Sequence, residues 1–341
     1  MLPDSKLLVT GGTGFLGAYL IRQLLAKGYA VRATRRANSP MDLVADIADQ
    51  VEWVDADVTD VVALEDAMTG ITEVLHCAAM VSFHPRDVAR MMQVNVEGTA
   101  NVANLALEMG VRKMIHVSSI ASLGRAKDRP TLDEDSKWVQ SRGNSNYAIS
   151  KYLSEQEVWR AHHEGLAVAI VNPAIIFGSG FWNLGSAKFF TQVEGGLKFC
   201  PTGSTGFVDV RDVARFMVHL LEGPQNGERY ILNSENASFR RLFDLIGASI
   251  DKKPPFIPVS PLLAEVAWRV EWLKEKILGA EPMVTKEAAR SSVSKYFYTS
   301  DKSKTVFDFT YRSLETTIRE TGAQFLEAKK AGFRAMVLEG M

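Results

Sequence analysis

The fold of this chain is decided by residues 7–17, which read LLVTGGTGFLG. The run from Lys6 to Thr10 has the length and apolar composition of a buried strand, and helical periodicity follows from Ala18 to Lys27. The glycines between them match the pattern G-x-G-x-x-G. A strand, a glycine-rich turn and a helix in this order are typical of a dinucleotide site, because the helix N-terminus faces the pyrophosphate. Glycines that serve packing alone are the alternative.

Outward from this turn, apolar strands alternate with helical segments as far as Pro173. Further strands are predicted at 30–34, 51–55, 74–77, 114–118 and 168–171, and helices at 64–68, 87–109 and 147–163. This alternation predicts an α/β Rossmann fold, a doubly wound parallel sheet with helices on both faces. We expect a dinucleotide-binding Rossmann domain at 1–173, to which 207–233 return. Residues 174–206 and 234–341 are expected to form a smaller, mainly helical substrate-binding part.

The bulk composition excludes several classes of partner. The 341 residues include 39 Lys and Arg against 40 Asp and Glu, a formal net charge of −1, so nucleic acid is not expected as a partner. The two cysteines, Cys77 and Cys200, lie far apart in no metal-binding spacing. We therefore predict neither a disulfide framework nor a metal site. No leader-like segment is recognised at the N-terminus, so a cytoplasmic protein is expected.

One amphipathic segment, Pro261 to Ala280, raises the question of membrane contact. It mixes Leu, Val, Trp and Ile with Glu, Lys and Arg throughout, which does not suit a spanning helix. We favour a helix packed on the protein's own core over a helix that contacts a membrane. The sequence leaves the oligomeric state open, with a homodimer as one option.

The end of the second strand bears on which dinucleotide binds. An NAD site usually has Asp or Glu there, about 20 residues after the glycines, to bind the ribose 2′-hydroxyl. This chain reads AVRATRR over residues 30–36 and so offers Arg35 and Arg36 instead of a carboxylate. Because guanidinium groups bind phosphate through charge-assisted, bidentate hydrogen bonds, the sequence favours NADP(H) over NAD(H). The alternative is that the arginines only face solvent.

A second motif, Y-x-x-x-K, is formed by Tyr147 and Lys151 after the fifth predicted strand. Residues i and i+4 of a helix share a face, so the phenol and the ammonium are expected to point into the same space. The cation is expected to lower the phenol pKa, which suits an acid/base for interconverting a hydroxyl and a carbonyl. Three serines at the end of the fifth strand, Ser118, Ser119 and Ser122, compete for the role of substrate-oxygen donor.

Together these motifs resemble the extended short-chain dehydrogenases/reductases of the NAD-dependent epimerase/dehydratase superfamily, over almost the whole chain. The stretches that carry the resemblance are 10–17, 57–58, 76–79, 95–99, 117–119, 147–151, 172–174 and 207–214. Residues 28–36 and 227–231 are most similar to members such as dihydroflavonol reductase and 3β-hydroxysteroid dehydrogenase. Residues 177–199 depart from the plant flavonoid enzymes, so a flavonoid substrate is not implied.

The resemblance assigns roles to individual residues. It implies a catalytic group of Ser119, Tyr147 and Lys151, with Asn95 supporting the active site. It also implies that Arg36 binds a 2′-phosphate. Together with the motifs, it predicts cofactor contacts at Gly11, Thr13, Gly14, Phe15, Leu16, Gly17, Arg35, Arg36, Asp57, Val58, Ala78, Ala79, Tyr147, Lys151, Pro173 and Ile176.

The main functional hypothesis is an NADP(H)-dependent oxidoreductase that interconverts a carbonyl and a secondary alcohol on an apolar or aromatic small molecule. Aromatic residues that could line its pocket, with core packing as the alternative, are Phe83, Phe177, Trp182, Phe189 and Phe190. A second hypothesis is an NAD-dependent nucleotide-sugar epimerase or dehydratase. Thr205 counts against it, since it stands where such enzymes carry a phosphate-binding arginine. A non-catalytic regulator that senses NADP is a third, disfavoured by the presence of Tyr147 and Lys151.

Overall fold

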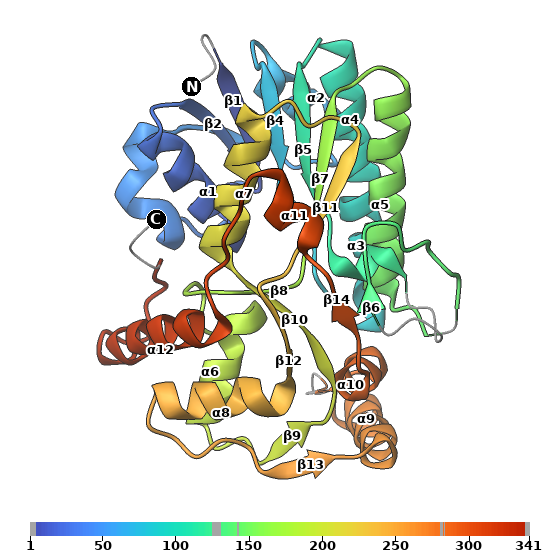
Figure 1. Ribbon diagram of the computed structural model, residues 1–341, viewed down its shortest axis with the longest axis vertical. Coiled ribbons are helices and arrows are strands. Elements are labelled where there is room, and N and C mark those ends of the chain that lie inside the picture. The colour runs from blue at the N-terminus through green and yellow to red at the C-terminus, as the bar shows by residue number, and fades with distance from the viewer. Residues whose placement is uncertain (1–4, 125–130, 142, 280–281, 283, 338–341) are drawn as a thin grey trace.

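The centre of the computed structural model, which describes residues 5–124, 131–141, 143–279, 282 and 284–337, is a seven-stranded sheet. The strand order is β11-β7-β5-β4-β1-β2-β3, and every pair is parallel. The strands are β1 (Lys6–Thr10), β2 (Ala30–Arg35), β3 (Glu52–Asp55), β4 (Glu73–His76), β5 (Lys113–Val117), β7 (Val168–Pro173) and β11 (Glu228–Leu232). The predicted doubly wound sheet is therefore confirmed (Figure 1).

Helices cover both faces of this sheet. On one face lie α1 (Phe15–Ala26) and α7 (Val210–Glu222), and on the other lie α2 (Val61–Met68), α4 (Gly98–Glu108) and α5 (Asn146–His163) (Figure 1). Successive side chains of a strand point to opposite faces. Accordingly, Leu7 and Val9 of β1 join the apolar cluster with α1 and α7, while Leu8 joins the cluster with α2 and α4.

The position of the candidate site follows from the strand order. The chain runs outward from β1 to β2 and β3, then returns to form β4 on the other side of β1. In open α/β sheets, the reversal of strand order opens a crevice at the carboxyl ends of the two central strands. The glycine-rich turn follows β1, so it lies at the edge of that crevice.

The helix predicted at 87–109 is interrupted. It consists of η2 (Pro85–Asp87), α3 (Val88–Met92), a π-helical turn η3 (Gln93–Glu97) and α4. A π-helical turn fits one extra residue into the helix and is frequent at functional sites. Sequence periodicity does not reveal such a turn, because the apolar pattern continues on either side of it.

A smaller lobe lies against the carboxyl edge of the large sheet. Its helices are α6 (Lys188–Glu194), α8 (Phe239–Ser249), α9 (Pro261–Leu278), α10 (Lys286–Val293) and α12 (Leu314–Lys330). Helix α11 (Asp301–Val306) lies instead against β11 of the large sheet, where Ser303 donates a hydrogen bond to the Ile231 carbonyl (Figure 1). The smaller lobe also contains three small strand groups, formed by β8 (Ile175–Phe177), β10 (Ser204–Asp209) and β12 (Glu235–Ser238), by β9 (Phe199–Pro201) and β13 (Ile257–Val259), and by β6 (Thr131–Leu132) and β14 (Phe297–Tyr298). Apart from β10, the sequence did not predict these strands. Most of these strands have only two or three residues, which is too short to show an alternating pattern. Residues 207–233 were expected to return to the Rossmann domain, but residues 207–209 belong to β10, which pairs with β8 and β12 and not with the large sheet.

Two further observations concern the described residues. Cys77 and Cys200 are both free thiols. Within the described ranges, no helix combines the length and the apolar composition needed to cross a bilayer.

Candidate active site

The glycine-rich turn joins β1 to α1, and close contacts require two of its glycines. Gly11 has φ of +69°, and a Cβ there would lie 2.9 Å from the Cα of Ala78. A Cβ on Gly17 would lie 2.3 Å from the carbonyl oxygen of Gly11, so α1 packs directly on the turn. Gly14, at the N-cap of α1, supplies no side-chain cap. A helix N-terminus of this kind is suited to an anionic ligand.

A cavity of about 420 Å³ opens beside this turn, at the carboxyl ends of β1, β2 and β4. It brings together these predicted cofactor residues: Gly11, Thr13, Gly14, Arg35, Arg36, Asp57, Val58, Ala78 and Ala79. They come from four separate loops, so the fold assembles them. A cavity lined by a glycine turn, small residues and arginines fits the adenosine and phosphate part of a pyridine nucleotide.

Other predicted cofactor residues do not line this cavity. Phe15 begins α1, with its ring edge-on to Tyr19 at 5.7 Å, and Leu16 is buried in the core. Pro173 ends β7, and Ile176 lies in β8, half-buried. Pro173 and Ile176 thus stand where the large sheet gives way to the smaller lobe.

The two arginines after β2 are not equivalent. The Nε of Arg35 donates a hydrogen bond of 2.8 Å to Oδ1 of Asp55 at the end of β3. Arg36 is exposed, and its side chain forms no ion pair with any described residue. Because Arg35 is already paired, Arg36 is the guanidinium available to a phosphate at the cavity.

Arg90 of α3 lines the same cavity and was missed by the sequence reasoning. Its Nη2 donates a hydrogen bond of 3.1 Å to Oδ2 of Asp57. Burial tends to raise the pKa of Asp57, but hydrogen bonds from Thr59 and the charges of Arg90 and Arg36 outweigh it, and the pKa is lowered. No sequence signal could have found Arg90, since only the tertiary fold brings α3 to the loop after β3.

The predicted catalytic residues Ser119, Tyr147 and Lys151 meet at the carboxyl end of β5. Ser145 caps the N-terminus of α5, which places Tyr147 in the first turn of that helix. The Ser119 side chain lies close enough to the Tyr147 phenol to lower the pKa of that phenol. One turn further along, the Nζ of Lys151 donates a hydrogen bond of 2.8 Å to the backbone carbonyl of Val117.

Burial controls the protonation of this group. It raises the pKa of the Tyr147 phenol, and the Ser119 side chain opposes the rise. It lowers the pKa of the Lys151 ammonium to about 8, against the attraction of Glu155. The predicted lowering of the Tyr147 pKa by Lys151 is therefore wrong in direction, because desolvation of the phenol dominates. At neutral pH, Tyr147 is a protonated acid that can donate its proton.

The geometry separates the three competing serines. Ser118 and Ser122 each donate a hydrogen bond of 2.7 Å to Oε2 of Glu155. Ser119 instead faces Tyr147. It is therefore the serine that can share a substrate oxygen with the phenol.

Glu155 is a second residue that the sequence reasoning missed. It is buried one turn after Lys151 on α5. Besides the two serine hydroxyls, Oε2 accepts a hydrogen bond from Nδ2 of Asn172 at 3.0 Å. Oε1 accepts from Nη1 of Arg229 at 3.1 Å and from Nε1 of Trp159 at 3.3 Å. Its i+4 spacing from Lys151 was the available signal, since that spacing places it on the same helix face.

Asn95 of the π-helical turn connects the segment after β4 to α5. Its Oδ1 accepts a hydrogen bond of 2.7 Å from the backbone N–H of Met80, and its Nδ2 donates to the Met80 carbonyl at 2.9 Å. The same Nδ2 lies 3.0 Å from Oγ of Ser150, which stands between Tyr147 and Lys151 in the sequence. This placement suits the supporting role that the family resemblance implies.

Of the aromatic residues predicted to line a pocket, Phe83 lies at the catalytic group. Its ring is edge-on to Tyr147, with 5.8 Å between ring centroids. The others lie in, or pack against, the apolar core of the smaller lobe: Phe177, Trp182, Phe189 and Phe190. Trp182, for example, is buried edge-on to Phe325 at 5.2 Å. These four residues pack in the core, so the alternative to a pocket lining is the one that the structure shows.

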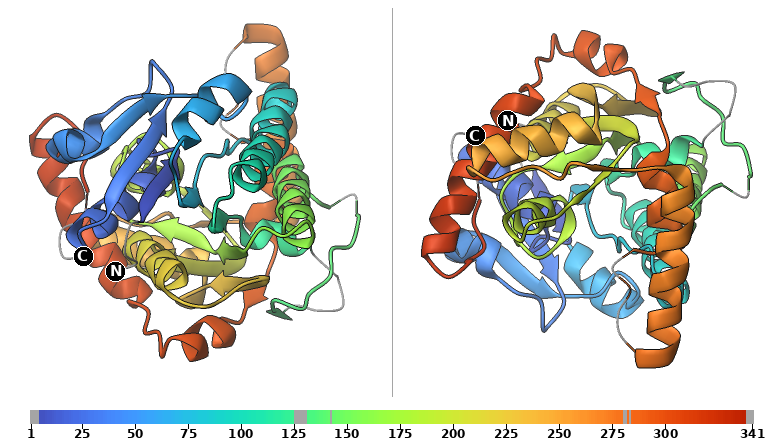
Figure 2. Two further views of the ribbon diagram at one scale, coloured as in Figure 1. Left: turned by 90° about the horizontal axis from the view of Figure 1, so that it is seen from above. Right: turned by 90° about the horizontal axis from the view of Figure 1, so that it is seen from below.

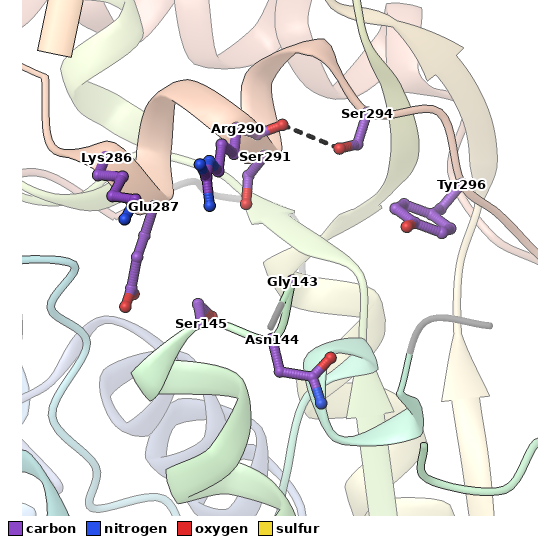
Figure 3. Close-up of a pocket in the computed structure, with 9 residues that line it drawn as sticks. All are labelled: Gly143, Asn144, Ser145, Lys286, Glu287, Arg290, Ser291, Ser294 and Tyr296. Carbon is purple, nitrogen blue, oxygen red and sulfur yellow. Dashed lines mark hydrogen bonds between the residues drawn. The ribbon is translucent and has the colours of Figure 1, made fainter. Parts of the chain in front are cut away.

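A separate polar cavity of about 240 Å³ lies at the N-terminus of α5 (Figure 3). Residues 143–145 form one wall, and α10 with the residues after it forms the other. In Figure 3, Glu287 extends from α10 toward Ser145. Its carboxylate accepts hydrogen bonds from the backbone N–H of Asn146 at 3.1 and 3.2 Å and from Nδ2 of Asn146 at 2.6 Å. Because Asn146 precedes Tyr147, this contact ties α10 to the start of α5.

Known proteins share both the sequence pattern and the fold. Residues 7–233 match the NAD dependent epimerase/dehydratase family. The putative dihydroflavonol 4-reductase of Synechocystis sp. is 32% identical over 86% of this chain and 87% of its own length. Sterol demethylase protein B of Methylococcus capsulatus is 31% identical over 76% of this chain and 78% of its own length. The crystal structure of gox2253 has a TM-score of 0.82 and 32% identity, and covers 97% of this chain and 99% of that one.

The chain therefore belongs to the NAD dependent epimerase/dehydratase family, within the extended short-chain dehydrogenases/reductases. The family resemblance found in the sequence is confirmed. Members of this family use a pyridine nucleotide, and the residues present fit one. Gly11 and Gly17 have no Cβ where the turn packs most closely on its neighbours. The cavity beside the turn is lined both by residues at the N-terminus of α1 and by Arg36.

Proposed function

We propose that this protein is an NADP(H)-dependent oxidoreductase that interconverts a carbonyl and a secondary alcohol on an apolar or aromatic small molecule. The observation that carries this proposal is the cluster of Ser119, Tyr147 and Lys151, with the ring of Phe83 against Tyr147. The similarity to a putative dihydroflavonol 4-reductase supports it. The similarity to sterol demethylase protein B supports an apolar substrate.

When bound, the nicotinamide would supply or accept the hydride. In the reductive direction, Tyr147 donates its phenolic proton to the substrate oxygen, which is the task of a general acid. Ser119 donates a hydrogen bond to the same oxygen and so stabilises the charge that develops there. Lys151 provides a positive charge one helical turn from the phenol. In the oxidative direction, the deprotonated phenol of Tyr147 takes the proton from the substrate hydroxyl.

The preference for NADP(H) rests on Arg36. Its guanidinium is exposed at the cavity and unpaired within the described residues, whereas Arg35 is held by Asp55. Arg90 adds a second positive charge to the same cavity. Other predicted contacts are proposed for the phosphates and the adenine: Gly11, Thr13, Gly14, Asp57, Val58, Ala78 and Ala79. Pro173 and Ile176 are proposed to border the nicotinamide.

We propose the domain division expected from the sequence on the same basis. Residues 1–173 with 207–233 form the cofactor-binding domain, except that residues 207–209 of β10 pair within the smaller lobe. Residues 174–206 with 234–341 form the substrate-binding part. Both cysteines are free thiols, which supports a reducing, cytoplasmic location.

The test is a panel of ketones and aldehydes with apolar bodies, scored by the loss of NADPH absorbance. We expect NADPH consumption that depends on the carbonyl compound and is lost in Tyr147→Phe. The contrary result would be saturable binding of a UDP- or dTDP-sugar in calorimetry, with no carbonyl reduced by NADPH. That result would favour an epimerase or dehydratase, and it would show that Thr205 does not prevent the binding of a nucleotide sugar.

A further inference from the structure

Helix α9 protrudes from the body of the protein, as both views in Figure 2 show for the orange helix. Core packing was predicted for this helix, yet Ala264 is the only buried residue among its described side chains. The helix instead exposes an apolar stripe with three- and four-residue spacing: Leu262 (77% exposed), Val266 (50%), Val270 (47%), Leu273 (51%) and Ile277 (70%). That spacing places these side chains along one helix face, and nothing in the described chain covers it.

In the described part of residues 261–297, the basic side chains are more exposed than the acidic ones. Among the described residues of 261–297, every exposed ionisable side chain is basic: Arg269, Lys274, Lys276, Lys286, Arg290 and Lys295. The acidic side chains in the same part of the described chain are half-buried: Glu265, Glu271, Glu275 and Glu287. The outer surface of α9 and α10 therefore combines apolar and positively charged groups.

The acidic side chains hold the two helices in place. Glu275 of α9 lies 3.1 Å from Nε2 of His84, in the segment after β4. Glu265 accepts a hydrogen bond of 2.9 Å from Nε of Arg290 on α10. Glu287 accepts from Asn146, as described above. At the surface, Arg269 and Arg290 both pair with Glu265, and Lys274 pairs with Glu271. The excess of positive charge therefore comes from Lys276, Lys286 and Lys295, which form no ion pair with a described carboxylate.

A groove of about 620 Å³ extends the apolar face toward the body of the protein. Its apolar lining is formed by Pro85, Trp268, Trp272, Leu273, Pro282 and Val284. The ammonium of Lys276 lies 4.7 Å from the ring centre of Trp272. Tryptophan at an apolar surface, with basic side chains that reach past it, is typical of a helix lying at a membrane interface.

We propose that α9 and α10 form a docking surface for an anionic lipid bilayer, with the apolar stripe inserted among the acyl chains and the basic side chains at the headgroups. The sign of the charge selects this occupant. A second copy of the chain would bring two positive surfaces together, which is unfavourable, whereas anionic headgroups complement them. The proposal does not depend on the proposed function.

The test is flotation of the full chain with vesicles of phosphatidylcholine alone or of phosphatidylcholine with phosphatidylglycerol. We expect binding to the anionic vesicles, about tenfold stronger than to the neutral ones and weakened by added salt. Val266→Glu with Leu273→Glu should reduce binding by at least about tenfold, because two charges would enter the acyl region. Val62→Glu is the matched control, since Val62 is 71% exposed on α2, and it should bind like the wild type.

Thermal unfolding of each variant verifies that it is folded. Equal binding by the wild type and the α9 double variant would overturn the proposal, as would the absence of binding to anionic vesicles. Sedimentation of the wild type over a range of concentrations supplies a second measurement. A dimer that dissociates in the double variant would assign this face to a second copy and also overturn the proposal.

Discussion

The Nζ of Lys151 donates a hydrogen bond of 2.8 Å to the backbone carbonyl of Val117, the last residue of β5. This bond fastens α5 to the strand whose end carries the serines. The ammonium is buried, and burial lowers its pKa to about 8 from the ordinary 10.5. Lys151 is thus held by one neutral partner, with its charge balanced in part by Glu155.

The first prediction concerns stability against pH. Below pH 8, Lys151 is charged in both the folded and the unfolded chain. Burying its charge then lowers the free energy of unfolding by the full desolvation cost. Between pH 8 and 10.5, the unfolded chain binds a proton that the folded chain does not, so stability rises with pH. The rise amounts to roughly 3 kcal/mol at most. Urea unfolding should show it in the wild type and in Lys304→Met, which alters an exposed lysine, but not in Lys151→Met. Parallel curves for all three proteins would contradict it.

The second prediction concerns Glu155. Glu155→Gln should lower the free energy of unfolding by about 2–3 kcal/mol, because an amide cannot replace a carboxylate that accepts from Arg229 and two serines. Urea unfolding at neutral pH measures the change. Glu157→Gln is the control on the same helix, since Glu157 pairs with Arg160 at the surface, and it should change stability by less than about 0.5 kcal/mol. Equal effects of the two substitutions would show that the buried network contributes no more than a surface pair.

The third prediction concerns proton transfer. Tyr147→Phe should retain cofactor binding and lose turnover by a factor on the order of 10² or more, as expected when a general acid is removed. Steady-state rates with a carbonyl substrate, together with a cofactor titration, separate the two effects. Tyr152→Phe is the control, because Tyr152 lies on the same helix and stacks on Trp138 at 4.4 Å. Near-normal turnover in Tyr147→Phe would remove the role proposed for the phenol.

The fourth prediction concerns cofactor choice. Arg36→Ala should weaken the binding of NADPH by roughly 10-fold, which is the lower end for a charge-assisted hydrogen bond at an exposed site. The affinity for NADH should stay nearly unchanged. Arg35→Ala is the control, since Arg35 is paired with Asp55 and should affect NADPH less. Quenching of tryptophan fluorescence measures both cofactors, and the difference should shrink as salt increases. An equal loss for NADH and NADPH in Arg36→Ala would show that this arginine does not bind the 2′-phosphate.

Local sequence was sufficient wherever a short motif has one structural solution. Gly11 and Gly17 occupy positions that a Cβ would block, and the spacing of Tyr147 and Lys151 places both on one helix face. The choice of Ser119 over Ser118 was different. It followed from the family resemblance, and only the contact of Ser118 with Glu155 gives it a physical reason.

The failed predictions share a cause. Composition predicts burial of aromatic residues but not whether they face a pocket or a core, so the sequence left both options open for Trp182, which lies in the core. A helix pattern predicts an amphipathic α9 but not that its apolar face stays exposed. Whether the pKa of Tyr147 is raised or lowered depends on how deeply the phenol is buried, and the motif does not reveal this burial.

The sequence by itself therefore determined the Rossmann sheet, the dinucleotide turn and the residue types of the catalytic group, because each is signalled by a periodicity or motif within a short stretch of the chain. The tertiary structure alone decided that Arg90 joins Arg36 at one cavity, that Glu155 holds Ser118 and that α9 is left exposed. These features depend on packing between segments far apart in the sequence, and no local pattern encodes it.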